Sequence, residues 1–271
     1  MRPVSDTHDR TATPPADALA RAWRYAYRTP MLLWHLLVHL PLVMLALLPP
    51  WADIDVGHGE RFGHRMIRAW SSGMLRVFGF RPRRFGTPLP GATLFVANHV
   101  SWIDIVALHS QRMMGLVAKH EIASWPVIGW VAGQGETIFH QRGSQESLGG
   151  VLQQMLARLR GGHSVGVFPE GRARDGVEVG PFHARIFLAA VEAGVGVQPV
   201  ALRYGTQAAV QAVVAFGPDE NFMQNLLRLL GEPPRVADVV FCEGIVPGFA
   251  DGRRQIAGLA RARVVDALRR P

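Results

Sequence analysis

Lysine and cysteine are almost absent from this chain of 271 residues. Lys119 is the only lysine among 29 lysines and arginines, and Cys242 is the only cysteine. A single cysteine excludes an intrachain disulfide and a cysteine metal cluster, and it is consistent with a reducing compartment. The 11 histidines form no H-E-x-x-H motif and have no paired carboxylates at metal-ligand spacing. The sequence therefore predicts no metal site, and we expect Lys119 at the surface.

Acidic residues are fewer than basic ones. The chain has 21 Asp and Glu and 29 Lys and Arg, which gives a formal net charge of +8. This balance is compatible with nucleic acid, anionic lipid or phosphorylated small molecules as partners. The chain has no basic recognition motif for nucleic acid, and its arginines gather beside an apolar run. We therefore expect a membrane surface with anionic lipid and no nucleic acid. A non-enzymatic basic binding protein is the alternative that charge alone leaves open.

An apolar run without formal charge extends from Met31 to Leu48. A helix over it would measure about 27 Å, slightly less than the hydrocarbon core of about 30 Å. Positive charge on both flanks argues against a single crossing. The pattern predicts a re-entrant or hairpin anchor, bent near Pro41, with both ends in the cytoplasm, and a buried core helix is the alternative. The flanking arginines include Arg21, Arg24 and Arg28 before the run and Arg61 and Arg65 after it.

The segment from Glu60 to Phe80 has the pattern of a basic amphipathic helix. Such a helix can lie in the headgroup plane with arginines on lipid phosphates, at roughly 1 kcal/mol each. Equally, its apolar stripe can pack on the anchor, and the two roles are compatible. The apolar side consists of Phe62, Met66, Trp70, Met74 and Val77, and the polar side of Arg61, Arg65, Arg68, Ser72 and Arg76.

From Gly91 onward, short β-rich runs alternate with helical patterns, which predicts an α/β domain. The expected strands are Thr93–Ala97, Gly115–Ala118, Thr137–His140, Ser164–Phe168, Val197–Arg203, Val210–Phe216 and Val236–Cys242. The expected helices include Glu146–Arg160, His183–Ala193, Glu220–Leu230 and Arg253–Arg269. We expect three parts: a partly mobile segment 1–30, the anchor and amphipathic helix 31–85, and the α/β domain 86–271.

The most informative motif is NHVSWID at Asn98 to Asp104, between a short apolar strand and a helix. Ser101 followed by Asp104 fits a capping box with Ser101 as N-cap, which places His99 just outside the helix. The imidazole of His99 can then fold back onto Asp104. A carboxylate on one ring nitrogen leaves the other free to take a proton from a hydroxyl, so a substrate alcohol would be the nucleophile. The alternative is that Asp104 only caps the helix.

A G-x-S-x-G pattern, GHSVG at Gly162 to Gly166, raises the alternative of a serine hydrolase. In hydrolases a strand leads into this elbow and a helix follows it. Here the expected order is the reverse. The acid and histidine after Ser164 would have to be Asp175 and His183, crowded into one loop. The context therefore argues against a hydrolase.

Three further segments follow NHVSWID in order: KHEIASWPVIGW at Lys119 to Trp130 leading to TIFHQRG at Thr137 to Gly143, FPEG at Phe168 to Gly171, and VQPVAL at Val197 to Leu202. Together the four resemble the glycerolipid acyltransferase family, the 1-acylglycerol-3-phosphate O-acyltransferases and their relatives. The resemblance covers roughly Leu94 to Leu202. It implies an α/β fold in which helices flank a mixed central sheet, behind a membrane-anchoring helical segment.

The resemblance also implies roles for particular residues. His99 matches the catalytic base and Asp104 its partner, while Pro199 matches a proline associated with the acyl donor. The positions linked to the acceptor's phosphate are Arg142, Glu170 and Gly171, with Arg172 as a further candidate. Arginine suits such an anchor because its planar fork is permanently charged. The residues alone leave simpler alternatives open. Each arginine could be a solvated surface charge, Gly171 a turn residue, and Glu170 a structural partner for a buried arginine.

The implied activity is transfer of a fatty acyl group from acyl-CoA or acyl carrier protein to the free hydroxyl of 1-acylglycerol-3-phosphate, giving phosphatidate. It needs no metal or prosthetic group, and it would take place at the cytoplasmic face of the inner membrane. The chain departs from the family where Arg172, Ala173 and Arg174 replace the usual Thr-Arg after FPEG. Relatives that acylate lyso-ornithine lipid also vary here and continue, like this chain, with Asp-Gly and Pro-Phe-His. An acyltransferase for lyso-ornithine lipid or another lysolipid is therefore the alternative.

Overall fold

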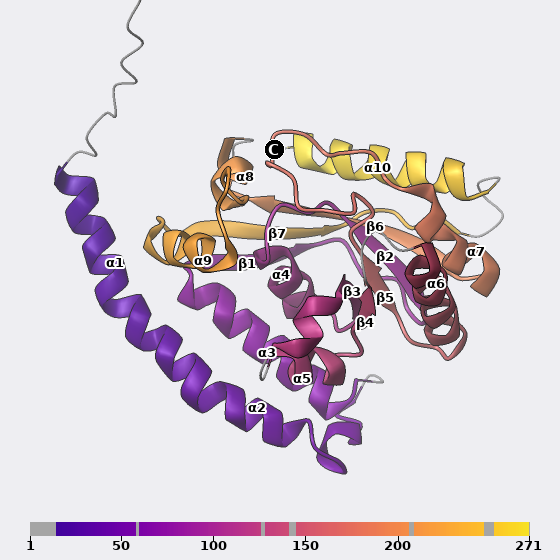
Figure 1. Ribbon diagram of the computed structural model, residues 1–271, viewed down its shortest axis with the longest axis horizontal. Coiled ribbons are helices and arrows are strands. Elements are labelled where there is room, and N and C mark those ends of the chain that lie inside the picture. Colours follow the sequence, from indigo (N-terminus) through magenta and orange to yellow (C-terminus); the bar gives the residue numbers. More distant parts are fainter. Residues whose placement is uncertain are drawn as a thin grey trace, which may run out of the picture.

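The computed structural model describes residues 15–57, 60–125, 128–140, 145–205, 209–246 and 252–270. Its centre is a seven-stranded sheet in the order β1-β7-β6-β2-β5-β3-β4 (Figure 1). The sheet is mixed, as expected, because β7 runs antiparallel to β6 while the other neighbours are parallel. The strands are β1 (Phe80–Phe85), β2 (Thr93–Ala97), β3 (Gly115–Lys119), β4 (Ile138–His140), β5 (Val165–Val167), β6 (Gly196–Tyr204) and β7 (Arg235–Phe241).

Two strand predictions need correction. Val210–Phe216 was predicted as a strand, but residues Ala209–Val214 form the helix α8. A short apolar run shows no clear period, so it does not distinguish a buried strand from a buried helix. The edge strand β1 was not predicted, because its sequence FRPRRF contains three arginines and a proline. Proline is tolerated on an edge strand, where one side of the ladder is unpaired.

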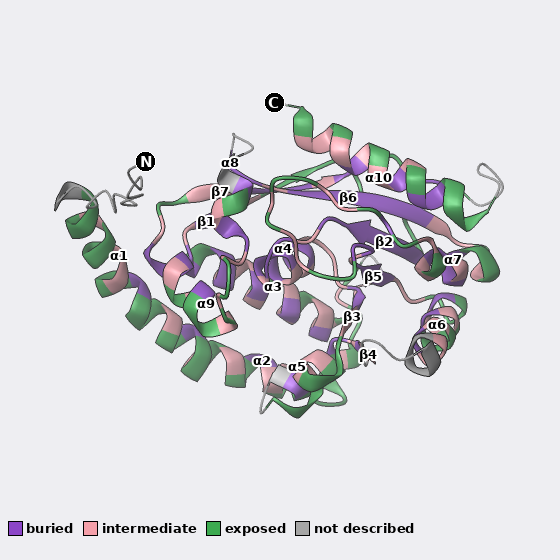
Figure 2. Ribbon diagram, turned by 45° about the horizontal axis from the view of Figure 1, so that its top comes forward, coloured by how far each residue is buried: buried purple, intermediate pink, exposed green. Residues whose placement is uncertain are grey.

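Helices cover both faces of the sheet (Figure 2). One apolar core lies under α3 (Phe62–Val77), α4 (Ile103–Gln111) and α9 (Phe222–Gly231). The second lies under α6 (Gln145–Arg160), α7 (Leu188–Ala193) and α10 (Arg253–Arg269). The predicted helices thus exist, with ends that differ by a few residues. Shorter helical segments are α5 (Ile128–Gln134), η2 (Trp51–Asp53), η3 (His120–Ser124) and η4 (Ala184–Phe187).

The N-terminal part is one long helix rather than a hairpin bent near Pro41. It consists of α1 (Pro15–Trp34), a π-helical turn η1 (His35–His39) and α2 (Leu40–Ala46). Pro41 comes two residues after the π-helical turn, and the helix continues through it. The chain reverses only after Ala46, and it returns as α3, which packs against α2.

The apolar stripe of α3 is used inside the molecule. Ile67, Val43 and Leu47 form a small buried cluster, against which Met66 and Trp70 pack. Other residues of α3, such as Leu75, pack into the main core. The expectation that this helix packs on the anchor is therefore confirmed. These apolar side chains are already occupied by protein, so they are not available to insert into lipid.

Three arginines dock α1 onto the C-terminal end of α9. Arg21 Nη2 donates to Glu232 Oε1 at 3.0 Å, and Arg24 Nε donates to Gly231 O at 2.6 Å. Arg28 is 1% exposed, and its Nη1 donates to Leu230 O at 2.9 Å and Glu232 O at 2.7 Å. The carbonyls at a helix C-terminus carry partial negative charge and need donors. These arginines, which the sequence suggested as flanking charges of an anchor, therefore attach α1 to the α/β domain.

We expect Arg28→Ala to lower the free energy of unfolding by about 3 kcal/mol, because two carbonyls lose a charged donor and a cavity opens at a buried site. Urea or thermal unfolding in detergent measures the change. Arg65→Ala is the matched control, since Arg65 is exposed on α3. If both substitutions changed the free energy of unfolding by the same small amount, the docking role of Arg28 would be contradicted.

Candidate active site

The sequence motifs meet at one edge of the sheet. Strands β2, β5, β6 and β3 are parallel, so their carboxyl ends share the same edge, where ligands of α/β proteins bind. His99 follows β2, Glu170 follows β5, and Lys119 is the exposed last residue of β3. Arg142, which follows β4, lies outside the described residues. The sheet therefore explains how motifs that are distant in sequence come together.

The structure brings the side chains of His99 and Asp104 into direct contact. His99 Nδ1 lies 2.8 Å from Asp104 Oδ2, and Asp104 is fully buried. The same oxygen accepts hydrogen bonds from Val100 N at 2.6 Å and Ser101 N at 2.9 Å. The bond at Nδ1 leaves Nε2 as the nitrogen that can receive a proton from a substrate. Phe168 stacks on the imidazole with ring centroids 4.1 Å apart.

The predicted capping arrangement is present at the start of the following helix. The helix α4 begins at Ile103, and the backbone of Trp102 before it is already helical. Ser101 Oγ accepts a hydrogen bond from Ile103 N at 3.4 Å, as an N-cap side chain does. The carboxylate of Asp104 reaches back to the amide of Ser101, as expected for the other half of a capping box. Asp104 thus supports the turn and contacts His99 with the same oxygen.

Asp104 has a further partner that the sequence did not suggest. Tyr204, the last residue of β6, donates its hydroxyl to Asp104 Oδ1 at 2.6 Å. Burial, followed by the charge of Asp104, raises the pKa of Tyr204 well above its ordinary value, so the phenol stays protonated and acts as a donor. Tyr204 is one of only three tyrosines and comes two residues after the VQPVAL segment. That rarity was the one signal in the sequence.

Glu170 connects the His99 loop to the loop after β5. Its Oε1 accepts a hydrogen bond from His99 N at 2.9 Å, and its Oε2 accepts one from Gly180 N at 2.7 Å. Arg174 Nε lies 3.5 Å from Oε2. Burial raises the pKa of Glu170, against the two backbone hydrogen bonds, which lower it. Both carboxylate oxygens are thus engaged by the protein, which fits the structural alternative for Glu170 better than a direct contact with substrate.

The loop after Glu170 is hydrogen-bonded to the segment that carries His99, because Arg174 N donates to His99 O at 2.8 Å. The Arg174 side chain lies against Gly180 of the same loop, where a Cβ atom would be 2.7 Å from Arg174 Nε. Arg172, by contrast, is exposed. The cation next to His99 and Glu170 is therefore Arg174. Its position four residues after Glu170 was the only sequence signal for it.

Two of the expected substrate positions have structural roles in this geometry. Gly171 has φ +74°, a left-handed conformation that favours glycine, and its N donates to Phe168 O at 3.1 Å. Pro199 is buried in β6 opposite Val96, and its carbonyl accepts a hydrogen bond from Cys242 N at 2.9 Å. Gly171 therefore allows the turn that carries Glu170, and Pro199 belongs to the sheet that supports the site.

The serine of the GHSVG pattern lies away from this site. Ser164 precedes β5, so it is at the opposite edge of the sheet from His99, and its hydroxyl donates to Gly91 O at 3.1 Å. The geometry therefore does not support a serine hydrolase.

Among the described residues, no group of three or more His, Cys, Asp or Glu is placed to hold a metal ion.

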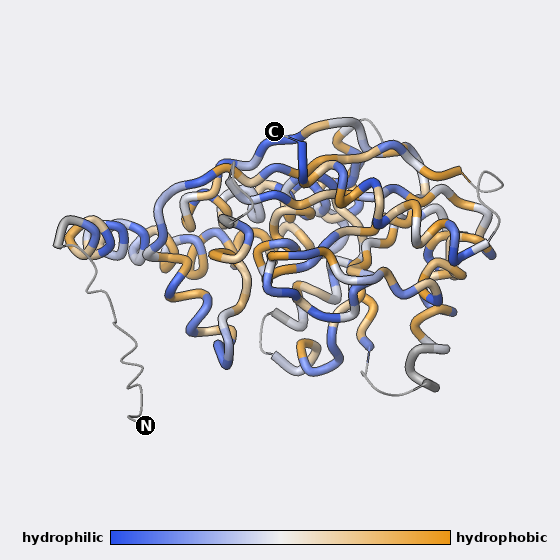
Figure 3. The backbone as a smooth tube through the Cα atoms, turned by 90° about the horizontal axis from the view of Figure 1, so that it is seen from above, coloured by the Kyte–Doolittle hydropathy of each residue, from blue (hydrophilic) through white to orange (hydrophobic). Residues whose placement is uncertain are grey.

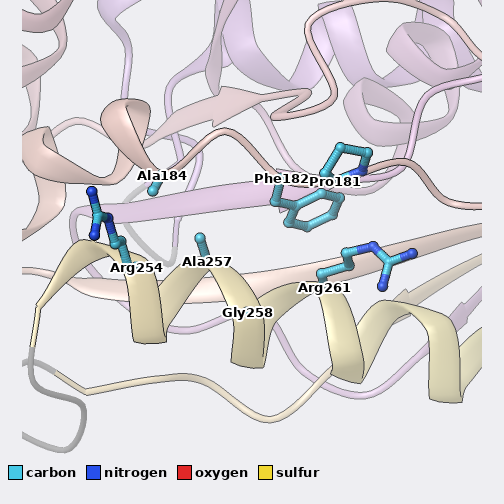
Figure 4. Close-up of a pocket in the computed structure, with 7 residues that line it drawn as sticks. All are labelled: Pro181, Phe182, Ala184, Arg254, Ala257, Gly258 and Arg261. Atoms are coloured by element: carbon cyan, nitrogen blue, oxygen red, sulfur yellow. The ribbon is translucent and has the colours of Figure 1, made fainter.

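A hollow of about 390 Å³ opens between α10 and residues 181–184 (Figure 4). Its lining includes Phe182, Arg254 and Arg261, but neither His99 nor Asp104. Arg261 donates to Gly180 O at 2.9 Å and Val179 O at 2.6 Å. This hollow therefore adjoins the end of the loop after β5 and is separate from the His99–Asp104 pair.

Comparison with known proteins gives consistent matches. The Acyltransferase family model matches residues 86–203. A lyso-ornithine lipid O-acyltransferase from Pseudomonas aeruginosa is 36% identical over 167 residues, which is 61% of this chain and 64% of that protein. A 1-acyl-sn-glycerol-3-phosphate acyltransferase from Neisseria gonorrhoeae is 39% identical, over 52% of this chain and 56% of that protein. The chain thus spans somewhat less than two thirds of either relative.

Two further comparisons cover more of the chain. A lyso-ornithine lipid O-acyltransferase from Brucella abortus is 32% identical over 75% of this chain and 79% of that protein. The crystal structure of the 1-acyl-sn-glycerophosphate (LPA) acyltransferase PlsC from Thermotoga maritima has a TM-score of 0.70 and 17% identity, and it covers 93% of this chain and 95% of that chain. The structural likeness supports the fold. The family model and the sequence relatives show that this chain belongs to the glycerolipid acyltransferase family, and the His99–Asp104 geometry agrees with them.

Proposed function

We propose that the protein transfers a fatty acyl group from acyl-CoA or acyl carrier protein to the free hydroxyl of a lysolipid, with 1-acylglycerol-3-phosphate as the first candidate acceptor and phosphatidate as its product. The observation that carries this proposal is the 2.8 Å contact between His99 Nδ1 and buried Asp104, at the carboxyl edge of the sheet. A histidine held in this way is a general base that lacks a serine of its own.

The reaction follows from that geometry. His99 Nε2 takes the proton of the lysolipid hydroxyl while the hydroxyl oxygen attacks the thioester carbonyl. The tetrahedral intermediate collapses, the carbon–sulfur bond breaks, and the imidazolium returns the proton to the leaving thiolate. Asp104 stabilises the imidazolium that forms in between. Apolar neighbours such as Phe168, stacked on the ring, help to keep water from the thioester.

We expect His99→Ala to lower kcat at least about 100-fold, because positioned proton transfer contributes about 10² to 10⁴-fold. Asp104→Asn should also lower kcat while it preserves the shape of the turn. His163→Ala is the control, since His163 contacts Glu136 and precedes β5, at the other edge of the sheet. Steady-state kinetics with circular dichroism measure both effects. A folded His99→Ala enzyme with near-normal turnover would refute the mechanism.

Two acceptors are supported by particular observations. Names of the relatives include both 1-acyl-sn-glycerol-3-phosphate and lyso-ornithine lipid acyltransferases. The Arg172, Ala173, Arg174 sequence, and Asp175–Gly176 after it, are the features that favour lyso-ornithine lipid as the second candidate. We propose Arg142 as the ligand of an acceptor phosphate, by its place in the family motif. Glu170, Gly171 and Pro199 then act by supporting the site, and Arg172 and Arg174 are cations at its rim.

The acceptor is tested by assays of purified protein against lysophosphatidate, lyso-ornithine lipid and lysophosphatidylglycerol with one labelled acyl-CoA. We expect the highest kcat/KM with lysophosphatidate, and a rise in the KM for it in Arg142→Ala with little change in the KM for acyl-CoA. Arg160→Ala, at the far end of α6, is the control. A preference for lyso-ornithine lipid would assign the protein to the second candidate. Equal effects of Arg142→Ala on both substrates would make Arg142 a structural residue.

The N-terminal helix and the relatives indicate association with a membrane. Within the described residues, Asp17–Ala46 is long and apolar enough to cross a bilayer, with a mean hydropathy of 1.6 over its most apolar window. Only 11% of that window is buried, and hydrophobic and hydrophilic residues alternate along the helix where it extends from the domain (Figure 3). Its exposed apolar side chains include Leu19, Trp23, Met31, Trp34, Leu37, Leu42 and Leu45.

We propose that this helix lies along the cytoplasmic face of the inner membrane, with Met31 to Leu48 as the main anchor. Arg21, Arg24 and Arg28 attach α1 sideways to the domain, so a crossing would require these hydrogen bonds to break. Acyl-CoA and acyl carrier protein are cytoplasmic, which supports the same side for the active site. Anionic lipid beneath a chain of charge +8 adds electrostatic attraction.

We expect the double substitution Leu37→Glu and Leu45→Glu to weaken binding to phosphatidylglycerol vesicles at least about 10-fold, because each leucine loses an apolar environment worth about 2 kcal/mol. These side chains are 71% and 60% exposed, so the fold should tolerate the change. Val246→Glu is the matched control, at 62% exposure. Vesicle flotation measures the binding. Unchanged flotation of the double variant would contradict the proposed orientation.

A further inference from the structure

Among the described residues, four donors hold the carboxylate of Asp104, and Tyr204 is the one of these that reaches its second oxygen. Oδ2 accepts from His99 Nδ1, Val100 N and Ser101 N. Oδ1 accepts from the Tyr204 hydroxyl at 2.6 Å. Asp104 and Tyr204 are 0% and 1% exposed, so water does not replace this bond. A buried carboxylate oxygen without a donor is costly, which gives the phenol a strong hold on the carboxylate.

The position of Tyr204 is itself fixed by the fold. Its backbone N donates to Gln211 Oε1 at 2.7 Å, and Gln211 Nε2 donates to Leu202 O at 2.9 Å. Asn98, next to His99, donates to Leu202 O at 3.0 Å and accepts from Leu202 N at 2.8 Å. The phenol ring meets Phe80 edge-on, with centroids 5.6 Å apart. The end of β6 and the His99 loop are thus parts of one hydrogen-bonded unit.

We propose that Tyr204 is a positioning residue for acyl transfer: its hydroxyl fixes the plane of the Asp104 carboxylate and withdraws part of its charge from His99. This inference rests on the proposed function. With Tyr204 in place, Oδ2 faces His99 Nδ1, and the carboxylate shares its charge among four donors. Without the phenol, more of the charge acts on the imidazole, which favours its protonated form, the form that cannot accept a proton from the lysolipid.

The test is Tyr204→Phe, which keeps the ring against Phe80 and removes only the hydroxyl. We expect kcat to fall about 10-fold with little change in either KM, and the acidic limb of the pH–kcat profile to move to higher pH by about half a unit or more. The ionisable groups beside the pair in the described residues are Glu170 and Arg174, and neither is altered by this substitution.

Two controls separate positioning from packing and from the proposed function. Phe80→Leu loosens the packing around the same ring but keeps the hydroxyl, so it should lower the melting temperature and leave the acidic limb in place. Two results would overturn the inference. In the first, folded Tyr204→Phe has an unchanged kcat and an unchanged acidic limb. In the second, its kcat falls but the acidic limb stays in place, as expected for Phe80→Leu. The His99→Ala variant separates failure of this inference from failure of the proposed function. If His99→Ala is inactive, the proposed function stands even where Tyr204→Phe overturns the inference. If His99→Ala is active, the proposed function fails too.

Discussion

The buried carboxylate of Asp104 is the constraint on which the site depends. A fully buried charge is tolerated only when donors surround it, and four groups in the described part of the chain do so: one imidazole, two backbone amides and one phenol. Each donor comes from a segment that the carboxylate also orders. The turn after β2, the start of α4 and the end of β6 are therefore held around one side chain. His99 takes its orientation from the same centre, so the stability of the turn and the geometry of the proposed base have a common origin.

Glu170 extends this unit to the neighbouring strand. Because β5 lies next to β2, a carboxylate just after β5 reaches the backbone of His99, and its second oxygen closes the loop that ends at Gly180. Arg174 returns a hydrogen bond from that loop to His99 O. The docked helix α1 carries a row of exposed apolar side chains, through which we propose that the protein brings this site to a lipid surface. On this view, few side chains are left to contact the substrate, and most motif residues serve to place one imidazole.

Patterns of short range predicted much of this structure. The apolar run Thr93–Ala97, bounded by Pro90 and Gly91, is β2 as predicted, and the spacing of His99 and Asp104 indicated their contact. The predictions failed where the deciding contact is distant and leaves no pattern. Glu170 binds backbone amides, Arg28 binds backbone carbonyls, and Tyr204 lies 100 residues from its partner. The edge strand β1 is stabilised by pairing with β7 rather than by its own sequence, and the apolar residues of α8 have no period that separates helix from strand.

Nitrogen-15 NMR of histidine-labelled protein tests the central claim most directly, with the resonances of His99 assigned by their loss in His99→Gln. The account predicts that the neutral ring carries its proton on Nδ1, hydrogen-bonded to Asp104, and that Nε2 is unprotonated and free to act as a base. It also predicts that Asp104→Asn changes the Nδ1 signal. A neutral ring protonated on Nε2, or signals that do not respond to Asp104→Asn, would contradict the account.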